Sequence, residues 1–466
     1  MKKIMKFGGT SIADGEKIKH VVKLIQEEVK LGNTIVVVVS ALAGITDSLI
    51  QAIDKAKLSD FQFIKEFHES LSKRHYEVAK TAISDEKILS DVIKELNQKL
   101  SDLDKILTGI AYLGEVTPRS YDYVLSFGER LSAPIVSGAL NDVGIKSKSL
   151  TGGEAGIVTD SCFGEARPLM SITTQQVKER LEPLLKRGIV PVVTGFIACT
   201  PEGYITTLGR GGSDYTATIL GAALDVDEVW IWSDVDGLMT ADPKIEPKAK
   251  TIETISFSEA IEIAYFGAKV IHPRALEPTA EKGIPVRIKN TFNPKNPGTL
   301  IIKEQRIKEG DIVKAITIIK NVAAITVSGA GMVGALGVAA KVFGILGENN
   351  INVLMISQSS SEANISFIVP RAMLEKAVNA LELSLLGGGL IKEIIPESDV
   401  CVIAVVGAGM KGTPGVAARV FQAVAREGIN IMMIAQGSSE LNISFVVKEK
   451  DGDKAVRAIH REFNLG

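Results

Sequence analysis

Two glycine-rich loops carry residue types suited to holding a phosphate group. KFGGTS, residues 6–11, follows a short apolar stretch, and LGRGGSD, residues 208–214, precedes an apolar helix pattern. Glycines let backbone N–H groups approach phosphate oxygens closely, and a lysine adds a point charge. We therefore expect Lys6, Gly8 and Gly9 to be candidates for phosphate binding, although a structural strand-to-helix turn would explain the first loop at least as well.

Arg210 lies inside the second glycine loop, where a purely structural role is harder to argue. A guanidinium there favours bidentate capture of a carboxylate or phosphate. Ser213 and Asp214 have a simpler interpretation as N-caps of the following helix. No Gly-Lys-Ser/Thr segment occurs, and HRD and DFG are missing, which excludes the standard P-loop and the protein-kinase pattern.

Three further segments offer single charged residues, each with a structural alternative. SFGERLS (126–132) contributes Glu129, for which a solvated side chain or a pair with Arg130 is the simpler interpretation when the segment is taken singly. SDVDGLMTADPK (233–244) places Asp234 at the end of an expected strand, where α/β sheets bind ligands but acidic turns also occur. FGAKVIHP (266–273) offers Lys269, which either reaches phosphates or lies on the surface.

The elements that must position these loops alternate along the first 300 residues. Continuous Val/Ile runs between helical patterns predict a sheet covered on both faces, hence an α/β domain. A Pro/Asn-rich break at 290–298 marks a candidate boundary. The expected strands are 3–6, 34–40, 188–194, 228–232 and 284–288, and the expected helical segments are 16–29 and 50–115.

Beyond that break the sequence repeats itself. The segments that begin at Val327 and Val405 align without gaps, and each predicts strand, glycine turn, helix, strand, tight turn and strand. Helical segments at 373–386 and 454–463 complete each copy. Each also contains GxGxxG, a possible dinucleotide fingerprint. The early third strand and the small size favour instead a ferredoxin-like module that senses a small ligand.

Composition narrows the class of protein. The 466 residues have a net charge of −2, which argues against a nucleic-acid partner. Three cysteines lie far apart without CxxC, and no apolar run is long enough for a membrane span or a signal peptide. We therefore expect a cytoplasmic protein with no membrane association.

Taken together, the loops resemble the aspartate kinases of the amino-acid kinase fold. KFGGTS, VVSALAGITD, SFGERLS, LGRGGSDYTA, IWSDVDGLMTADP and FGAKVIHP occur in that family's order, and the repeats resemble its paired ACT domains. The resemblance implies a three-layer αβα sandwich at 1–300, followed by ferredoxin-like α+β modules at 301–395 and 396–466. Because the repeats reach the end of the sequence, we expect a monofunctional kinase without a fused homoserine dehydrogenase.

The resemblance also implies roles for individual residues. Lys6 would stabilise the transferring phosphoryl group and Asp214 would organise the catalytic loop, Glu129 would bind the α-ammonium of aspartate, and Arg210 its α-carboxylate. Met239 and Lys244 stand where many relatives have Tyr and Arg, which leaves the adenine contacts open. The remaining implied residues are Ser40 and Thr46 between substrate and phosphate, Gly8, Gly9 and Gly212 as N–H donors, and Ser233, Asp234, Lys244 and Lys269 at the nucleotide.

The implied reaction transfers phosphate from ATP to the β-carboxylate of L-aspartate and forms 4-phospho-L-aspartate, the first step of lysine, threonine and methionine biosynthesis. A carboxylate is ionised at pH 7, so no general base is required, consistent with the lack of a histidine cluster. Carboxylates with metal-ligand spacing are lacking, so we expect Mg²⁺ to arrive on the nucleotide rather than at a metal site of the protein.

The ACT resemblance implies feedback by an amino acid, and ISQSSSEANISF favours threonine over lysine. The implied effector residues are Met332, Gly337 and Gln358 in the first module, and Met410, Gly415 and Gln436 in the second. The alternative interpretation of Gln358 and Gln436 is that they are glutamines buried in the core of each module. Pairing of exposed strand edges would give a homodimer or tetramer. Two other functions stay open: a kinase for another acid, such as glutamate or N-acetylglutamate, and an amino-acid sensor with a decayed kinase half.

Overall fold

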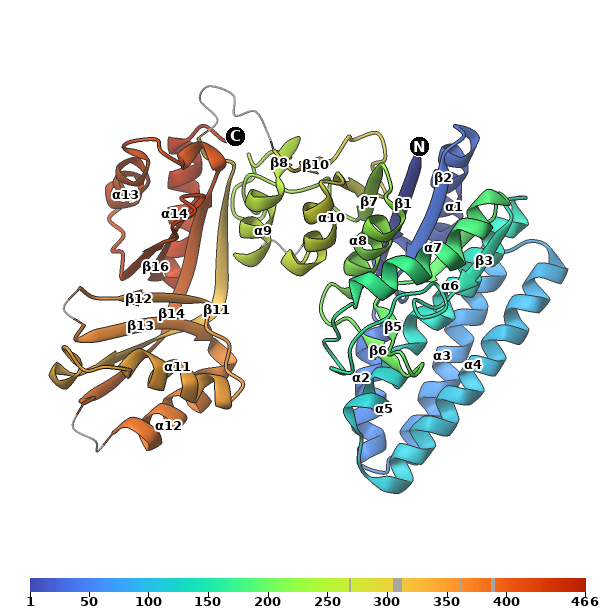
Figure 1. Ribbon diagram of the computed structural model, residues 1–466, viewed down its shortest axis with the longest axis horizontal. Helices are drawn as coiled ribbons and strands as arrows, with labels where there is room; N and C mark the ends of the chain where they lie inside the picture. Colours follow the sequence, from blue (N-terminus) through green and yellow to red (C-terminus); the bar gives the residue numbers. More distant parts are fainter. Residues whose placement is uncertain (268–269, 305–311, 361, 387–389) are drawn as a thin grey trace. The chain divides into compact units, whose positions relative to one another are not determined.

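The computed structural model describes residues 1–267, 270–304, 312–360, 362–386 and 390–466. The chain forms two units, each with its own sheet (Figure 1). The first comprises residues 1–238, 253–257 and 270–305, and the second comprises 239–252, 258–269 and 306–466. No helix among the described residues is long and apolar enough to cross a membrane.

The first unit is built on an eight-stranded sheet whose central strands are parallel. Residues of β1 pair with β2 on one side and β7 on the other, so Lys6 lies opposite Val38 and Ile231. Strand β10 runs antiparallel to its neighbour β9, and the edge strand β8 runs parallel to β10. The strand order is β3 (Ser147–Leu150), β4 (Val190–Thr194), β2 (Thr34–Val39), β1 (Lys2–Phe7), β7 (Glu228–Ser233), β9 (Val286–Asn290), β10 (Thr299–Ile302) and β8 (Thr254–Ser256).

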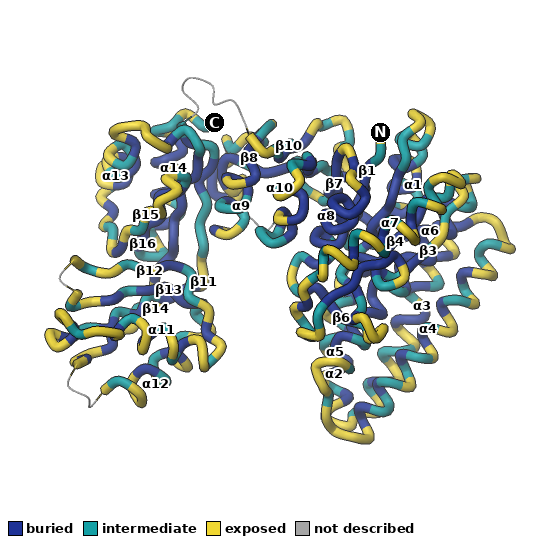
Figure 2. The backbone as a smooth tube through the Cα atoms, in the orientation of Figure 1, coloured by how far each residue is buried: buried dark blue, intermediate teal, exposed yellow. Residues whose placement is uncertain are grey.

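Helices cover both faces of this sheet, which confirms the three-layer αβα sandwich. Helices α1 (Gly15–Lys30), α3 (Phe61–Ala82), α4 (Glu86–Leu113) and α6 (Phe127–Asp142) pack together, while α7 (Met170–Lys186), α8 (Gly212–Leu224) and α10 (Glu277–Lys282) form another layer. The α4 residues Leu96, Leu100, Leu103 and Leu107 recur at helical spacing and are buried. Figure 2 shows buried and exposed segments alternating along this helix. Shorter helices α2 (Ile45–Lys57) and α5 (Pro118–Leu125) lie between them in the chain.

The second unit has a six-stranded antiparallel sheet that both repeats build. Its order is β12 (Met355–Gln358), β13 (Asn364–Pro370), β11 (Ala315–Ser328), β14 (Glu393–Val406), β16 (Asn442–Lys448) and β15 (Met433–Gln436). The helices are α11 (Val338–Glu348), α12 (Leu374–Leu385), α13 (Val416–Arg426) and α14 (Glu449–Glu462). Strands β12 and β13 form an antiparallel pair directly after α11. This pairing lacks the parallel crossover of a dinucleotide-binding unit, so the ferredoxin-like interpretation is confirmed.

The two modules exchange strands. Strand β11 pairs with β14 along both of its halves. Its second half, 322–328, also pairs with β13 of the first repeat, while its first half, 315–319, lies beside the part of β14 that pairs with β16 of the second repeat. Val313 and Ile316 accordingly belong to the core of the second repeat, although they precede the first repeat in sequence. The modules are therefore interleaved rather than consecutive.

A segment from within the kinase-like sequence also packs in the second unit. Ala241 and Ile245 join the core of the second repeat. Thr240 accepts a backbone hydrogen bond from Ile316 N (2.8 Å), and its hydroxyl lies 3.0 Å from His460 Nε2. Burial lowers the pKa of His460. Segment 239–252 is thus part of the repeat unit, although the chain enters it directly from the loop after β7.

Candidate active site

A cavity of about 540 Å³ opens at the carboxyl ends of the parallel strands in the first unit. Strands β1, β2 and β4 lead into it, and the N-termini of α2 and α8 border it. Such an edge is where α/β sheets bind ligands. The predicted residues that line it are Lys6, Gly9, Ser40, Thr46, Glu129, Arg210, Gly212 and Asp214.

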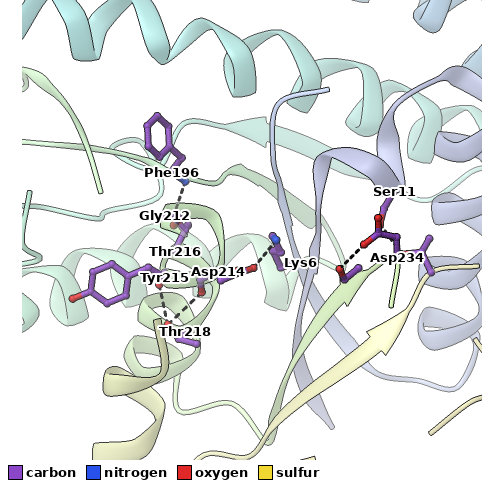
Figure 3. A network of polar contacts seen from close by, with 11 residues as sticks. Lys6, Ser11, Phe196, Gly212, Asp214, Tyr215, Thr216, Thr218 and Asp234 are labelled. Atoms are coloured by element: carbon purple, nitrogen blue, oxygen red, sulfur yellow. Dashed lines mark hydrogen bonds and ion pairs between the residues drawn. The ribbon is translucent and has the colours of Figure 1, made fainter. Parts of the chain in front are cut away.

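Lys6 and Asp214, which both line this cavity, form an ion pair. Lys6 Nζ lies 2.5 Å from Asp214 Oδ1, and Figure 3 shows the ammonium group turned towards the carboxylate. Both residues are 8 % exposed. The helix α8 begins at Gly212, with Gly211 as N-cap at φ +71°, so the N-cap interpretation of Ser213 and Asp214 is wrong. Asp214 instead lies in the first helical turn and is available to orient the lysine.

Glu129 presents one unpartnered oxygen inside the protein. It is 4 % exposed, and its Oε1 accepts a hydrogen bond from Ala41 N (3.1 Å), while its Oε2 is buried without a partner among the described residues. Burial raises the pKa of Glu129 to about 8, against the opposing effects of the Ala41 N–H, its own N–H and the Lys6 charge. A cationic ligand group would offset the cost of burying the ionised carboxylate and would provide a partner for Oε2.

The loop 40–44 is held from several sides. Ser132 Oγ donates to Ser40 O (2.7 Å), and an Arg74 guanidinium nitrogen donates to Ala43 O (2.7 Å). Gly44 adopts φ +79° as N-cap of α2, so Thr46 falls in that helix's first turn. These contacts fix Ser40 and Thr46 at the cavity wall. Arg74, which belongs to the expected helical segment 50–115, was not predicted to be a site residue.

Arg210 extends from a turn that depends on glycine. Gly209 and Gly211, on either side of it, have φ of +74° and +71°, a backbone region that favours glycine. The Arg210 side chain is exposed and lines the cavity. Within the described residues, no hydrogen bond or ion pair engages its guanidinium. It is therefore available to a ligand anion.

Two of the glycines that were expected to donate N–H groups to phosphate make backbone hydrogen bonds within the protein. Gly8 N donates to Trp232 O (3.2 Å), continuing the β1–β7 pairing, and Gly212 N donates to Gly209 O (3.0 Å). Both N–H groups are engaged by backbone carbonyls of the protein here, and their role in phosphate binding stays a prediction. Gly9 allows a close approach instead, since a Cβ there would lie 2.7 Å from Ala41 O.

The predicted nucleotide residues that the structure describes fall in both units. Ser233 ends β7 and its hydroxyl donates to the Asp234 carboxylate (3.2 Å), while Asp234 is exposed. Lys244 is exposed in the segment that packs with the second unit, and its N–H donates to Asp242. Lys269 lies outside the described residues. No group of three or more His, Cys, Asp or Glu residues in the described ranges is arranged to hold a metal ion.

The predicted effector residues occupy equivalent places in the two repeats. Gly337 and Gly415 are the N-caps of α11 and α13, with φ of +78° and +84°. Gln358 and Gln436 end the edge strands β12 and β15 and are exposed, so the alternative of buried core glutamines is wrong. Met332 and Met410 are 2 % and 4 % exposed and belong to the two cores. Their side chains therefore pack inside the modules.

Sequence reasoning missed the partners of these effector loops. Glu362 and Glu440, both at positive φ, accept hydrogen bonds from Gly334 N and Gly412 N. The second loop has a further partner, because Glu259 of α9 (Phe257–Tyr265) accepts from Ala408 N (2.6 Å). The sequence signal that could have found them is that each glutamate ends the same Ser-Ser-Glu tripeptide after the second strand of its repeat.

Comparison with known proteins agrees with this architecture. The amino acid kinase family model matches residues 1–290, and the ACT domain model matches 325–385 and 403–463. Aspartokinase 1 of Arabidopsis thaliana is 35% identical over 469 residues, covering 99% of this chain and 80% of the relative. A bifunctional aspartokinase/homoserine dehydrogenase of Zea mays is 36% identical, and the chain spans half of its length.

Solved structures resemble the whole chain. E. coli aspartokinase III in complex with aspartate and ADP has a TM-score of 0.83, at 27% identity and 99% coverage of both chains. The same enzyme in complex with lysine and aspartate has a TM-score of 0.79. The chain belongs to the amino acid kinase family, and within it to the aspartokinases with C-terminal ACT domains.

Proposed function

We propose that the chain is an ATP:L-aspartate 4-phosphotransferase. The observation that carries the proposal is the buried, unpartnered Glu129 Oε2 in a cavity that also holds Arg210 and Lys6. Glu129 suits an α-ammonium group and Arg210 an α-carboxylate, so the pair recognises an amino acid with both groups free. Lys6 is then the cation for the phosphoryl group. E. coli aspartokinase III has been solved in complex with aspartate and ADP, which supports aspartate as the acceptor.

In this proposal the β-carboxylate of aspartate is the nucleophile. One of its oxygens attacks the γ-phosphorus of ATP, the bond from that phosphorus to the bridging oxygen breaks, and ADP leaves with the electron pair. The product is the mixed anhydride 4-phospho-L-aspartate. The acceptor is already ionised at pH 7, so Lys6 and the N-terminus of α8 need only neutralise charge on the transferring group. Asp214 holds Lys6 in place.

We assign the nucleotide to the ends of β1 and β7, with Ser233 and Asp234 as contacts. Mg²⁺ would enter on the phosphates of ATP, because this ion dehydrates reluctantly and commonly binds through phosphates and a few carboxylates. Lys244 and Lys269 remain proposed contacts to the nucleotide. Replacing Asp234 by Asn should raise the KM for Mg-ATP without a matching change for aspartate.

Trapping of the acyl phosphate tests the function directly. The full chain is incubated with Mg-ATP, hydroxylamine and a panel of acids: L-aspartate, L-glutamate, N-acetyl-L-glutamate and N-acetyl-L-aspartate. We expect hydroxamate from aspartate alone, because N-acetylation removes the ammonium that Glu129 binds. Equal turnover of glutamate would favour a broader acid kinase, and no turnover of any acid would favour a sensor with a decayed kinase half.

We further propose that the repeats bind an amino-acid effector, L-threonine, near Gly337 and Gln358 or near Gly415 and Gln436. Helix N-termini and glycine loops offer N–H groups to a carboxylate. E. coli aspartokinase III has been solved with lysine, so lysine is the comparison ligand. Threonine should inhibit hydroxamate formation, and either Gln358→Ala or its matched partner Gln436→Ala should abolish that inhibition. Inhibition by lysine alone would overturn the choice of threonine.

Assembly through the repeats completes the proposal. The edge strands β12 and β15 expose Ile356 and Ile434, which are 47% and 46% accessible and equivalent in the two repeats. Unpaired strand edges with apolar side chains favour pairing with another copy. Light scattering should find a dimer or tetramer, and Ile356→Glu or Ile434→Glu should shift it towards the monomer.

A further inference from the structure

Asp122 is a buried carboxylate beside the cavity that the mechanism does not use. It lies in α5, is fully buried and lines the same cavity as Glu129 and Arg210. Its Oδ2 accepts hydrogen bonds from Gly164 N (2.9 Å) and Thr207 N (2.8 Å), and its Oδ1 accepts from Thr207 Oγ1 (2.8 Å). With its oxygens occupied by protein donors, it is placed to hold other segments rather than to bind a ligand.

The segments that Asp122 holds support the arginine loop. Thr207 is three residues before Arg210, and its carbonyl accepts a hydrogen bond from Ala166 N (2.9 Å). The loop that contains Gly164 and Glu165 packs closely against the turn, because a Cβ on Gly209 would lie 3.2 Å from both Glu165 Cγ and Gly164 O. Asp122 therefore ties together both chain segments that border the turn before Arg210.

On its other side, Asp122 is connected to Glu129 by helical backbone. Ser126 N donates to Asp122 O (3.0 Å), and Arg130 N donates to Ser126 O (3.1 Å), so the hydrogen bonding continues from α5 into α6. Seven residues of helix span about 10 Å, which is a stiff connection. One rigid element thus carries the ammonium-binding carboxylate and the group that holds the arginine turn.

We propose that Asp122 is a positioning residue that sets the separation between Glu129 and Arg210, and so adapts the site to the α-amino-acid head group of its substrate. This inference rests on the proposed function. Loosening the turn would let Arg210 sample positions in which it no longer meets the α-carboxylate. The loss falls on binding of the amino acid, because Lys6 and Asp214 are held by their own ion pair.

The test compares Asp122→Ala with the conservative Asp122→Asn in the full chain. Alanine leaves two backbone N–H groups and a hydroxyl without their acceptor, and the KM for aspartate should rise at least tenfold, with the KM for ATP unchanged within twofold. Asparagine should restore a KM near the wild-type value. Its single amide oxygen can accept from both N–H groups, and its NH₂ can donate to the Thr207 hydroxyl. Thr207→Val, which removes only that hydroxyl, should raise the KM for aspartate about threefold.

Asp142→Ala is the matched control for lost stability. Asp142 also accepts two backbone hydrogen bonds between distant segments, from Ser84 N (3.1 Å) and Asp85 N (2.7 Å), but it does not line the cavity. Asp142→Ala should lower the thermal midpoint and leave both KM values unchanged. Equal rises of both KM values in Asp122→Ala, or no rise in a folded variant, would overturn the inference. A wild-type chain that phosphorylates no acid would instead overturn the proposed function, and the inference with it.

Discussion

At the scale of single residues, the site is defined by two charged side chains that lack a full set of partners within the described residues. Glu129 is buried with one oxygen unpartnered, while Arg210 is held out on a glycine turn without a protein partner in the described ranges. Lys6, by contrast, is already paired with Asp214. The protein thus supplies a partner for the cation that would face phosphate, whereas Glu129 and Arg210, the two groups proposed to bind the amino acid, await a ligand. A ligand that carries both an ammonium and a carboxylate supplies what is missing.

The raised pKa of Glu129 predicts how aspartate binding depends on pH. Only the ionised carboxylate attracts an ammonium group, and the pKa of about 8 means that the free enzyme is mostly protonated at Glu129 below that pH. The KM for aspartate should therefore fall about tenfold between pH 6 and 7, and about fivefold more between pH 7 and 8, where the titration approaches its midpoint. Glu129→Gln should give a high KM without this slope. The same slope in both proteins would refute the assignment, and the KM for ATP serves as the internal control.

Arg210→Ala should act mainly on the KM for aspartate. The variant removes a charged contact that is made equally in the ground state and the transition state, so kcat changes little. We expect the KM to rise at least about tenfold, in line with the loss of a charge-assisted hydrogen bond. Arg187→Ala, at an exposed arginine after α7, should match the wild type. An unchanged KM in Arg210→Ala would remove this arginine from the site.

At the scale of elements, the sequence predicted what depends on local pattern. Strand 34–40 and helix 16–29 were placed within a residue or so of β2 and α1, because apolar runs and helical periodicity are local signals. Strand 284–288 was placed two residues early, since β9 extends to Asn290. Motif order also predicted that Glu129, Arg210 and Lys6 would meet in one cavity. Roles set by long-range contacts could not be predicted: Asp122 reaches Thr207, and Arg74 reaches Ala43.

The helical layer carries a titratable group that predicts its acid stability. His75 of α3 is fully buried, its Nδ1 bonds to Leu71 O, and burial lowers the pKa to about 4. A lowered histidine pKa contributes stability above the unfolded value of 6.5, and this contribution is lost as pH falls towards 4. Between pH 7 and 5 the loss amounts to about 2 kcal/mol.

Urea denaturation at pH 7 and pH 5, followed by helicity, measures this effect. The drop in unfolding free energy between the two pH values should be about 2 kcal/mol smaller in His75→Leu than in the wild type. His68→Leu, at a half-buried histidine of the same helix, is the matched control and should keep most of the wild-type drop. Equal drops in His75→Leu and the wild type would show that His75 does not titrate in the unfolding reaction.

At the scale of the whole molecule, sequence repeats and folded modules do not coincide. The repeats are consecutive in the chain, yet β11 and β14 each contribute to both modules. Segment 239–252, which follows the proposed nucleotide loop, packs in the core of the second repeat. The module boundary expected at 395/396 stays a prediction. In the structure this position lies within β14, which pairs with β11 in both modules. The chain thus runs directly from the loop after β7 into the core of the repeat that would bind an effector.

This interleaving predicts which fragments can fold. A fragment of residues 396–466 lacks the first half of β11, which pairs with β14, and loses Val313 and Ile316 from its core. It should be unfolded by far-UV circular dichroism. A fragment of residues 312–466 retains both strands and should unfold cooperatively. Without Ala241 and Ile245 its thermal midpoint should lie below that of the repeat unit in the full chain. Cooperative unfolding of the 396–466 fragment would show that the second repeat is complete without the strand that precedes the first.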